Sequence, residues 1–253
     1  MSIFDAAVLG IVEGITEFLP ISSTAHLMFA SQALGLAQSA FVKSFEISIQ
    51  LGAILAVVVL YWRVLFDVPK LSRVIVAFIP TAAVGLTLYP FIKSSLIGNI
   101  PVALIALFVG GAALIAFERW HITRPTTQPR ELTYKEAFLV GLAQAVAVIP
   151  GVSRSAATIV GGLALGINRQ TIVEFSFLLA APTMAAATAL ALYKNAGEFS
   201  QANWGVLGVG FAVSFVVALA SIKWLLRFVR TRDFTGFGVY RIVAAAFFAL
   251  LLL

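Results

Sequence analysis

Two glutamates stand four residues apart inside an apolar segment near the N-terminus. Glu13 and Glu17 interrupt the run of residues 3–19, and this spacing places both side chains on one face of a helix, about one turn apart. A carboxylate at membrane depth costs about 2.5–3.5 kcal/mol on insertion scales. A buried pair neutralised by protonation is the structural alternative. We interpret Glu13 and Glu17 as a paired acid–base or cation site.

A string of hydroxyl side chains and a histidine follows the two glutamates directly. Ser22, Ser23 and Thr24 precede His26 within residues 20–26, and we expect one of the hydroxyls to cap the next helix. Capping does not account for three hydroxyls and a histidine one turn later. A hydroxyl beside an imidazole and a carboxylate is the set that nucleophilic catalysis requires. His121, in a predicted polar loop over 118–135, is given no role.

A second polar cluster occurs at residues 150–158. Its members are Gly151, Ser153, Arg154, Ser155 and Thr158. Gly151 permits a tight turn, and the N-terminus of the following helix presents free N–H groups. Arg154 is a permanent cation whose planar fork suits phosphate oxygens. The cluster predicts a phosphate site that faces the two glutamates, with a bracing salt bridge as the structural alternative.

The composition indicates that these residues lie in a membrane protein. Of the 253 residues, 61% are apolar and 11% are charged, whereas soluble domains carry about 25% charged residues. The net charge of +6 is attributed to basic cytoplasmic loops and not to nucleic-acid binding. The absence of cysteine excludes disulfides, thiolate metal sites and a cysteine nucleophile.

Ten apolar runs follow one another along the chain. Six are long enough to cross a hydrocarbon core of about 30 Å, namely 44–62, 74–92, 100–117, 172–193, 204–226 and 237–253. The other four form two pairs, 3–19 with 24–38 and 136–149 with 155–167, each joined by a short segment with proline. Polar backbone at membrane depth is tolerated where protein buries it. We therefore predict an all-α polytopic membrane protein with six full spans and two re-entrant helical hairpins.

The distribution of basic residues predicts the orientation. If both hairpins return to the side they entered from, one side collects Arg63, Lys70, Arg73, Arg119, Arg124, Arg130, Lys135, Arg169, Lys223, Arg227, Arg230, Arg232 and Arg241. The other side receives Lys43, Lys93 and Lys194, and Arg154 lies at a hairpin tip. Because cytoplasmic loops are enriched in Lys and Arg, we expect both termini and the site to face outside.

The two hairpins then enter from opposite faces, as an inverted-topology repeat requires. We expect one membrane domain over residues 1–253, with repeats over approximately 1–118 and 136–253. A short echo supports this: the sequences 10–13 and 20–23 resemble 141–144 and 150–153. Broken helices related by inverted symmetry usually bracket a substrate site.

Two motifs resemble a known family. Residues 13–26 (EGITEFLPISSTAH) and 150–158 (PGVSRSAAT) are similar to the two signature motifs of the bacitracin-resistance type undecaprenyl-pyrophosphate phosphatases (BacA/UppP), and the likeness extends over nearly the whole chain. The resemblance implies a bacterial inner-membrane hydrolase that converts undecaprenyl pyrophosphate to undecaprenyl phosphate and inorganic phosphate. Such an enzyme recycles the lipid carrier of peptidoglycan synthesis and confers bacitracin resistance.

The resemblance also implies roles for single residues. Glu13 and Glu17 hold a divalent cation, Mg²⁺ or Ca²⁺, or manage protons, and Ser23 is the first choice as nucleophile with His26 as its base. Phosphate binding is expected from Arg154, Ser153, Ser155, Thr158, Ser22 and Thr24. Attack by His26 itself, or directly by water, remains open.

A transporter or flippase of an anionic lipid is the rival class, because inverted repeats with broken helices are also a carrier architecture. A carrier has no use for a hydroxyl, an imidazole and two carboxylates on one hairpin, which favours hydrolysis. The expected partners are a polyprenyl pyrophosphate and membrane lipid, with a second copy of the chain as a candidate for a homodimer.

Overall fold

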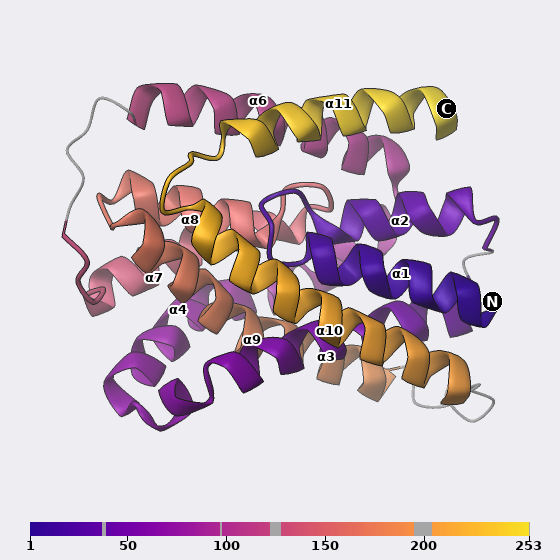
Figure 1. The fold of residues 1–253 in the computed structure, drawn as a ribbon, viewed down its shortest axis with the longest axis horizontal. Coiled ribbons are helices and arrows are strands. Elements are labelled where there is room, and N and C mark those ends of the chain that lie inside the picture. The colour runs from indigo at the N-terminus through magenta and orange to yellow at the C-terminus, as the bar shows by residue number, and fades with distance from the viewer. Residues whose placement is uncertain (37–38, 97, 122–127, 195–203, 253) are drawn as a thin grey trace.

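The computed structural model describes residues 1–36, 39–96, 98–121, 128–194 and 204–252, and it is built from helices. In chain order these are α1 (Ile3–Thr16), α2 (Ser23–Ala33), α3 (Ala40–Leu60), η1 (Trp62–Phe66), α4 (Val68–Thr87), α5 (Tyr89–Phe91), η2 (Ile92–Leu96), α6 (Ile100–His121), α7 (Tyr134–Ala145), η3 (Val146–Val148), α8 (Arg154–Ala164), α9 (Arg169–Lys194), α10 (Trp204–Phe228) and α11 (Thr235–Leu252). Figure 1 shows them as one bundle. No strand occurs in these ranges, so the all-α prediction is confirmed.

Five of the described helices are long and apolar enough to cross a membrane: α4, α6, α9, α10 and α11. Helix α3 contributes a shorter apolar stretch, Phe45–Leu60. The chain is therefore a polytopic membrane protein, as its composition predicts. The number of six full spans stays a prediction, because the apolar stretch found in α3, Phe45–Leu60, is shorter than those of the other five helices.

The four helices predicted to form hairpins are short. Helix α1 has 14 residues, α2 has 11, α7 has 12 and α8 has 11. At 1.5 Å per residue the longest of them reaches about 21 Å, too little for a hydrocarbon core of about 30 Å. Each pair is joined by a tight turn that contains a serine in the left-handed region, Ser22 at φ 72° and Ser153 at φ 77°.

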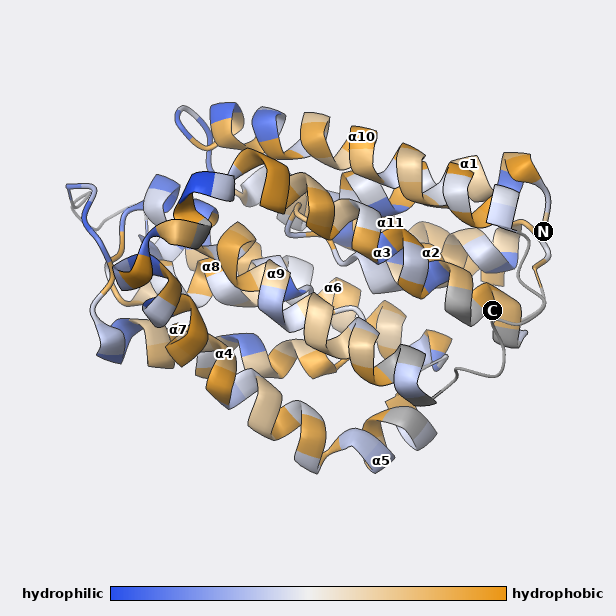
Figure 2. Cartoon of the chain, turned by 90° about the horizontal axis from the view of Figure 1, so that it is seen from below, coloured by the Kyte–Doolittle hydropathy of each residue, from blue (hydrophilic) through white to orange (hydrophobic). Residues whose placement is uncertain are grey.

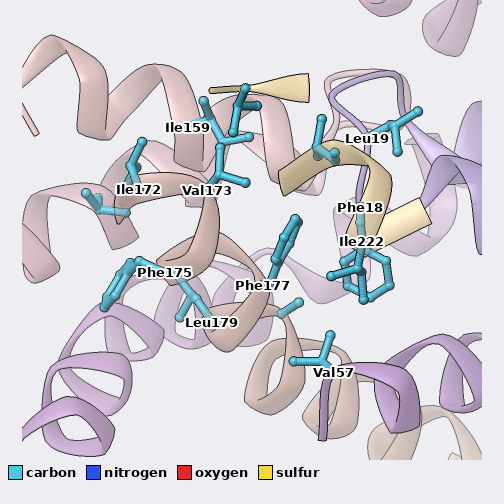
Figure 3. Packing of buried hydrophobic residues seen from close by; sticks show 14 of the residues in the cluster. Phe18, Leu19, Val57, Ile159, Ile172, Val173, Phe175, Phe177, Leu179 and Ile222 are labelled. Atoms are coloured by element: carbon cyan, nitrogen blue, oxygen red, sulfur yellow. The ribbon is translucent and has the colours of Figure 1, made fainter. Parts of the chain in front are cut away.

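The tip of the first hairpin is held by apolar packing on its neighbours. Phe18 is fully buried and meets Phe177 of α9 edge to face, with ring centroids 5.5 Å apart. Figure 3 shows Phe18 beside Ile222 of α10 and facing Phe177. Helix α1 also lies against α10 at Gly14, where an added Cβ would stand 2.7 Å from Cβ of Val217. Any larger residue at position 14 would push the helix that carries both glutamates away from α10.

Both termini lie at one end of the bundle, and the connections predicted to be cytoplasmic lie at the other (Figure 1). Figure 2 shows hydrophilic residues gathered at the end away from the termini and apolar residues along the middle of the helices. This separation of polar and apolar zones is what a bilayer requires of the surface that faces it. Of the basic residues used to predict the orientation, Arg124 lies outside the described residues, as do the side chains of Lys43, Lys93 and Lys194.

The predicted polar loop over 118–135 is wrong at its start. Helix α6 continues to His121, whose ring stacks on Phe117 one turn earlier. Glu118 lies within the helix and is buried, and its carboxylate receives both terminal nitrogens of Arg169 at 2.5 and 2.7 Å. It also accepts the backbone N–H of Phe234 at 3.1 Å. Glu118, a charged residue at the end of a span, is thus buried because it binds Arg169, a partner that the local sequence does not indicate.

Candidate active site

The two hairpin tips meet inside the bundle and bond to each other. The hydroxyl of Ser155, at the start of α8, donates to the backbone carbonyl of Leu19 in the first tip at 2.7 Å. Arg154, the first residue of α8, reaches the same tip through its side chain. The sequence prediction that the second cluster faces the first is therefore met by direct contacts between them.

Glu17 connects the reactive groups of the two hairpins. Its Oε2 accepts the hydroxyl of Ser23 at 2.5 Å, and its Oε1 accepts Nη2 of Arg154 at 2.9 Å. Glu17 is 7% exposed and Ser23 is 8% exposed, so water competes little with these bonds. A carboxylate within hydrogen-bond distance of a hydroxyl is placed to receive its proton.

Arg154 is fixed on its other side by α9. Its Nη1 donates to the backbone carbonyl of Ser176 at 2.8 Å and lies 3.3 Å from the hydroxyl of that residue. Its Nε is buried and has no hydrogen-bond partner. The guanidinium is thus held by Glu17 and Ser176 while one donor remains available for an anionic ligand.

Glu13 lies one turn before Glu17 and is fully buried. Neither of its carboxylate oxygens has a hydrogen-bond partner. A buried polar group without a partner costs about 1–3 kcal/mol, and a charged one costs more. Two unsatisfied acceptor oxygens beside a second carboxylate are what a hard divalent cation binds. The donor set therefore fits a cation held by Glu13 and Glu17, although no group of three or more His, Cys, Asp or Glu close enough for a metal is found within the described ranges.

Gln144 occupies the position in the second hairpin that echoes Glu13, and its environment differs. Its amide nitrogen donates to the hydroxyls of Thr81 at 2.8 Å and Thr183 at 3.2 Å, and its oxygen accepts the hydroxyl of Thr158 at 3.3 Å. Gln144 is fully buried and satisfied, whereas Glu13 is fully buried and unsatisfied. Of these two corresponding positions, the unsatisfied side chain is thus Glu13 on the first hairpin.

His26 does not contact Ser23 as the sequence analysis expected. Its Nδ1 lies 2.7 Å from the backbone carbonyl of Ser22, and its Nε2 lies 2.8 Å from the hydroxyl of Tyr240. Both ring nitrogens are engaged, and the hydroxyl of Ser23 turns to Glu17 instead. In this structure Glu17 is thus the group positioned to act as the base for Ser23.

The remaining predicted phosphate ligands divide into bonded and exposed residues. Ser153 caps α8 by accepting the backbone N–H of Ala156 at 3.2 Å, and Thr158 donates to the carbonyl of Arg154 at 2.8 Å. Ser22 precedes α2 but forms no capping bond with its side chain, contrary to the expectation that a hydroxyl caps this helix. Thr24 is exposed on α2. The backbone N–H groups that begin α2 are therefore not covered by the side chain of Ser22.

Arg241, on α11, binds both tips and was placed wrongly by the sequence analysis. It was expected on the cytoplasmic side, but its side chain is fully buried. Its guanidinium donates to five backbone carbonyls, those of Pro20 (3.1 Å), Gly151 (2.8 Å), Val152 (3.0 Å), Ala106 (3.3 Å) and Leu107 (3.3 Å). Its position five residues into the apolar run 237–253 is the sequence feature that indicates burial.

The fold and the site together define a polytopic helical membrane protein with a carboxylate, a hydroxyl and a guanidinium held between two short helical hairpins. A family model described as Bacitracin resistance protein BacA matches residues 6–247. The chain belongs to this family.

Curated relatives are similar to this chain over nearly its full length. A protein of Aquifex aeolicus named undecaprenyl-diphosphatase is 50% identical over 98% of this chain and 99% of its own. Proteins of the same name from Sulfurihydrogenibium sp. and Thermus thermophilus are 49% and 44% identical, over 96% and 98% of this chain and 96% and 97% of their own.

Replacement of Arg241 by lysine should weaken the joint between the tips. An ammonium group has three donors against the five bonds of the guanidinium, so at least two buried carbonyls lose their partner. We expect Arg241→Lys to lower the free energy of unfolding by about 2–4 kcal/mol, measured by thermal unfolding of the purified protein in detergent. Arg227→Lys, at an exposed position of α10, is the matched control and should change stability by less than about 0.5 kcal/mol. Equal unfolding of the two variants would contradict the role given to Arg241.

Proposed function

We propose that this protein is an undecaprenyl-diphosphatase, an integral membrane enzyme that hydrolyses undecaprenyl pyrophosphate to undecaprenyl phosphate and inorganic phosphate. The observation that carries the proposal is the position of Glu17 between the hydroxyl of Ser23 and the guanidinium of Arg154. The curated relatives carry the name of this activity, and family membership supports a role in recycling the cell-wall lipid carrier and in bacitracin resistance. Their names favour hydrolysis over the transporter alternative.

Ser23 is the nucleophile in the proposed reaction. Its oxygen attacks the terminal phosphorus while its proton passes to Glu17, and the bond from that phosphorus to the bridging oxygen breaks. Undecaprenyl phosphate leaves, and water then hydrolyses the phosphoserine to release inorganic phosphate. Glu17 serves both steps: it accepts the serine proton and passes it to the departing undecaprenyl phosphate, and it then accepts a proton from the attacking water and returns it to the oxygen of Ser23 as the phosphoserine bond breaks.

Arg154 binds the pyrophosphate through its Nε, the nitrogen that has no partner within the protein. Phosphoryl transfer depends mainly on positioning and on neutralising charge over the transferred oxygens. The backbone N–H groups at the start of α2 and the hydroxyls of Ser22 and Thr24 complete the anion site on one side. Ser153, Ser155 and Thr158 support the second tip from behind, since their hydroxyls already bond within the protein.

A divalent cation, Mg²⁺ or Ca²⁺, is assigned to Glu13 with Glu17. When bound, it supplies positive charge that offsets the negative charge of the pyrophosphate in the transition state. Glu13, whose two oxygens lack partners in the protein, would be the main ligand, and Glu17 would support the cation from one turn away. A bound cation would thereby stabilise the charged form of the Glu13 carboxylate although the side chain is buried.

Removal of the proposed nucleophile, base or anion ligand should abolish most of the activity. We expect Ser23→Ala, Glu17→Gln and Arg154→Ala each to lower kcat/KM for a short polyprenyl pyrophosphate by about 100-fold or more, measured as phosphate release by purified protein. Ser94→Ala, at an exposed serine of η2 that bonds to Phe91 and Ser95 and to no residue of the tips, is the control. Undiminished release by Glu17→Gln and Arg154→Ala would overturn the site.

The same assay separates the three candidate nucleophiles. A phosphate ester on Ser23 survives acid quenching, a phosphoramidate on His26 does not, and direct attack by water leaves neither adduct. Rapid acid quenching with a substrate labelled in its terminal phosphate should leave acid-stable label on the wild-type protein and none on Ser23→Ala. Label that is lost in acid would move the role to His26.

Removal of the cation should suppress hydrolysis reversibly. We expect a chelator to lower phosphate release and added Mg²⁺ or Ca²⁺ to restore it. In Glu13→Gln the concentration needed for half of the restored rate should rise by about 10-fold or more, because one of two carboxylates is lost. Glu174→Gln, whose carboxylate accepts a bond from Gln170 on α9, is the matched control. Full activity in the presence of the chelator would remove the cation from the mechanism.

The orientation is part of the proposal: both termini and the active site face outside the bacterial inner membrane, and the chain is an inverted repeat over approximately 1–118 and 136–253. Exchange of the halves carries several of the main helix pairings into one another. Helix α1 packs on α10 and α7 packs on α4, and α3 packs on α10 as α9 packs on α4. Helices α6 and α11 pack on each other. The homodimer stays a prediction.

The lack of native cysteine gives a direct test of orientation. In intact cells, a membrane-impermeant maleimide should label Ser94→Cys, near the end that carries the termini, and should label Arg232→Cys only after the cells are opened. Both positions are exposed. The reverse pattern would invert the topology, and labelling of both from outside would refute the assignment of the loops.

A further inference from the structure

Tyr240, directly before Arg241 on α11, is the long-range partner of His26 on α2. Its hydroxyl lies 2.8 Å from Nε2 of His26. The two rings also stack, with centroids 5.6 Å apart and planes inclined by 10°. His26 is buried, so this contact gives a hydrogen-bond partner to the ring nitrogen that does not meet Ser22.

The other ring nitrogen determines which atom donates in that contact. Nδ1 of His26 lies 2.7 Å from the carbonyl oxygen of Ser22, and a carbonyl oxygen only accepts, so Nδ1 carries the proton. In a neutral imidazole Nε2 is then an acceptor, and the hydroxyl of Tyr240 donates to it. The two bonds together select one tautomer and one orientation of the ring.

His26 in turn fixes the turn that positions Ser23. Ser22 has a left-handed backbone at φ 72°, and its carbonyl also accepts the backbone N–H of His26 at 3.3 Å. Because the side chain of Ser22 makes no capping bond, the imidazole N–H is the side-chain group that holds this peptide. A change in the ring orientation would therefore move the residue that begins α2.

The far side of Tyr240 faces an apolar surface. It lines a groove of about 370 Å³ formed with Ile15, Leu19, Ile21, Trp224, Phe228, Gly236 and Phe237. A tyrosine with one apolar side and a buried imidazole on the other places its hydroxyl where a polar partner exists. Tyr240 thus contacts His26 through both its hydroxyl and its stacked ring, and its side chain also lines the apolar groove.

We propose that Tyr240 is a positioning residue for the reaction: its hydroxyl holds the imidazole of His26 against the Ser22 carbonyl, the acceptor that sets the tautomer protonated on Nδ1. His26 in turn holds that carbonyl so that Ser23 faces Glu17. The kinetic consequence rests on the proposed function, whereas the tautomer does not. Tyr240 touches neither Ser23 nor Glu17 by any hydrogen bond described here, and acts through the imidazole.

The tautomer is measured by ¹⁵N spectroscopy of protein labelled at histidine. The chain has two histidines, so His121→Gln leaves the signals of His26 alone. We expect the wild-type His26 to show a protonated Nδ1 and an accepting Nε2. In Tyr240→Phe, which keeps the ring and removes the donor, the two tautomers should both be populated.

The kinetic arm uses the same variants. Loss of one hydrogen bond should lower kcat by about three- to tenfold and should change KM by a smaller factor, because Arg154 on the second hairpin keeps its contacts. Tyr193→Phe, at a tyrosine that is 84% exposed on α9, should match the wild type in both measurements. Tyr240→Ala, which also removes the stacked ring, should be slower than Tyr240→Phe.

Three results would overturn the proposal: a wild-type His26 protonated on Nε2, an unchanged tautomer in Tyr240→Phe, or an unchanged kcat in that variant. If the wild-type protein released no phosphate, the proposed hydrolysis would fail, and the ¹⁵N spectra of the wild type and Tyr240→Phe would still decide whether Tyr240 sets the state of His26. Failure of the activity and failure of the contact are thereby distinguished.

Discussion

The meeting of two hairpin tips inside the bundle depends on one buried guanidinium. Both tips are turns with backbone carbonyls that do not take part in helical hydrogen bonds, and in a membrane interior each such group needs a donor. Arg241 supplies donors to Pro20 of the first tip and to Gly151 and Val152 of the second. Its remaining bonds reach carbonyls of α6. The cation is thus shared by the two hairpins and the helix behind them, and the active-site residues lie on either side of this joint.

The charges left inside the protein have distinct functions. Arg241 and the pair of Glu118 with Arg169 are fully engaged with protein groups and act as supports. Glu13 and the Nε of Arg154 have no partner within the protein. Burial of a charge without a partner is unfavourable, so the second set is the one that a cation and an anionic substrate would satisfy. Supporting residues are thus distinguished from candidate site residues by whether their polar atoms have hydrogen-bond partners, because both sets contain arginine and glutamate.

The sequence predicted the features that depend on local pattern. Hydropathy located the ten main helices within a few residues, and the serine-rich motifs located the tips. It could not predict contacts set by tertiary packing. Arg241 was counted with the basic residues of the cytoplasmic side because its acceptors on the two tips, more than eighty residues away along the chain, could not be foreseen. His26 was paired with Ser23 because Tyr240 is equally remote. Glu118 was expected in a loop because its partner is on α9.

The left-handed backbone of Ser22 and Ser153 has a further consequence. For a residue other than glycine this conformation costs about 1–2 kcal/mol, and the protein carries that strain at the two turns that meet. Strain of this kind persists only where the surroundings over-determine it, and here Arg241 bonds to Gly151 and Val152 beside one turn while His26 bonds to the carbonyl of the other. The groups proposed to react are accordingly held in one arrangement without a ligand, and the cost of that order lies in the backbone and is offset by the helices around it.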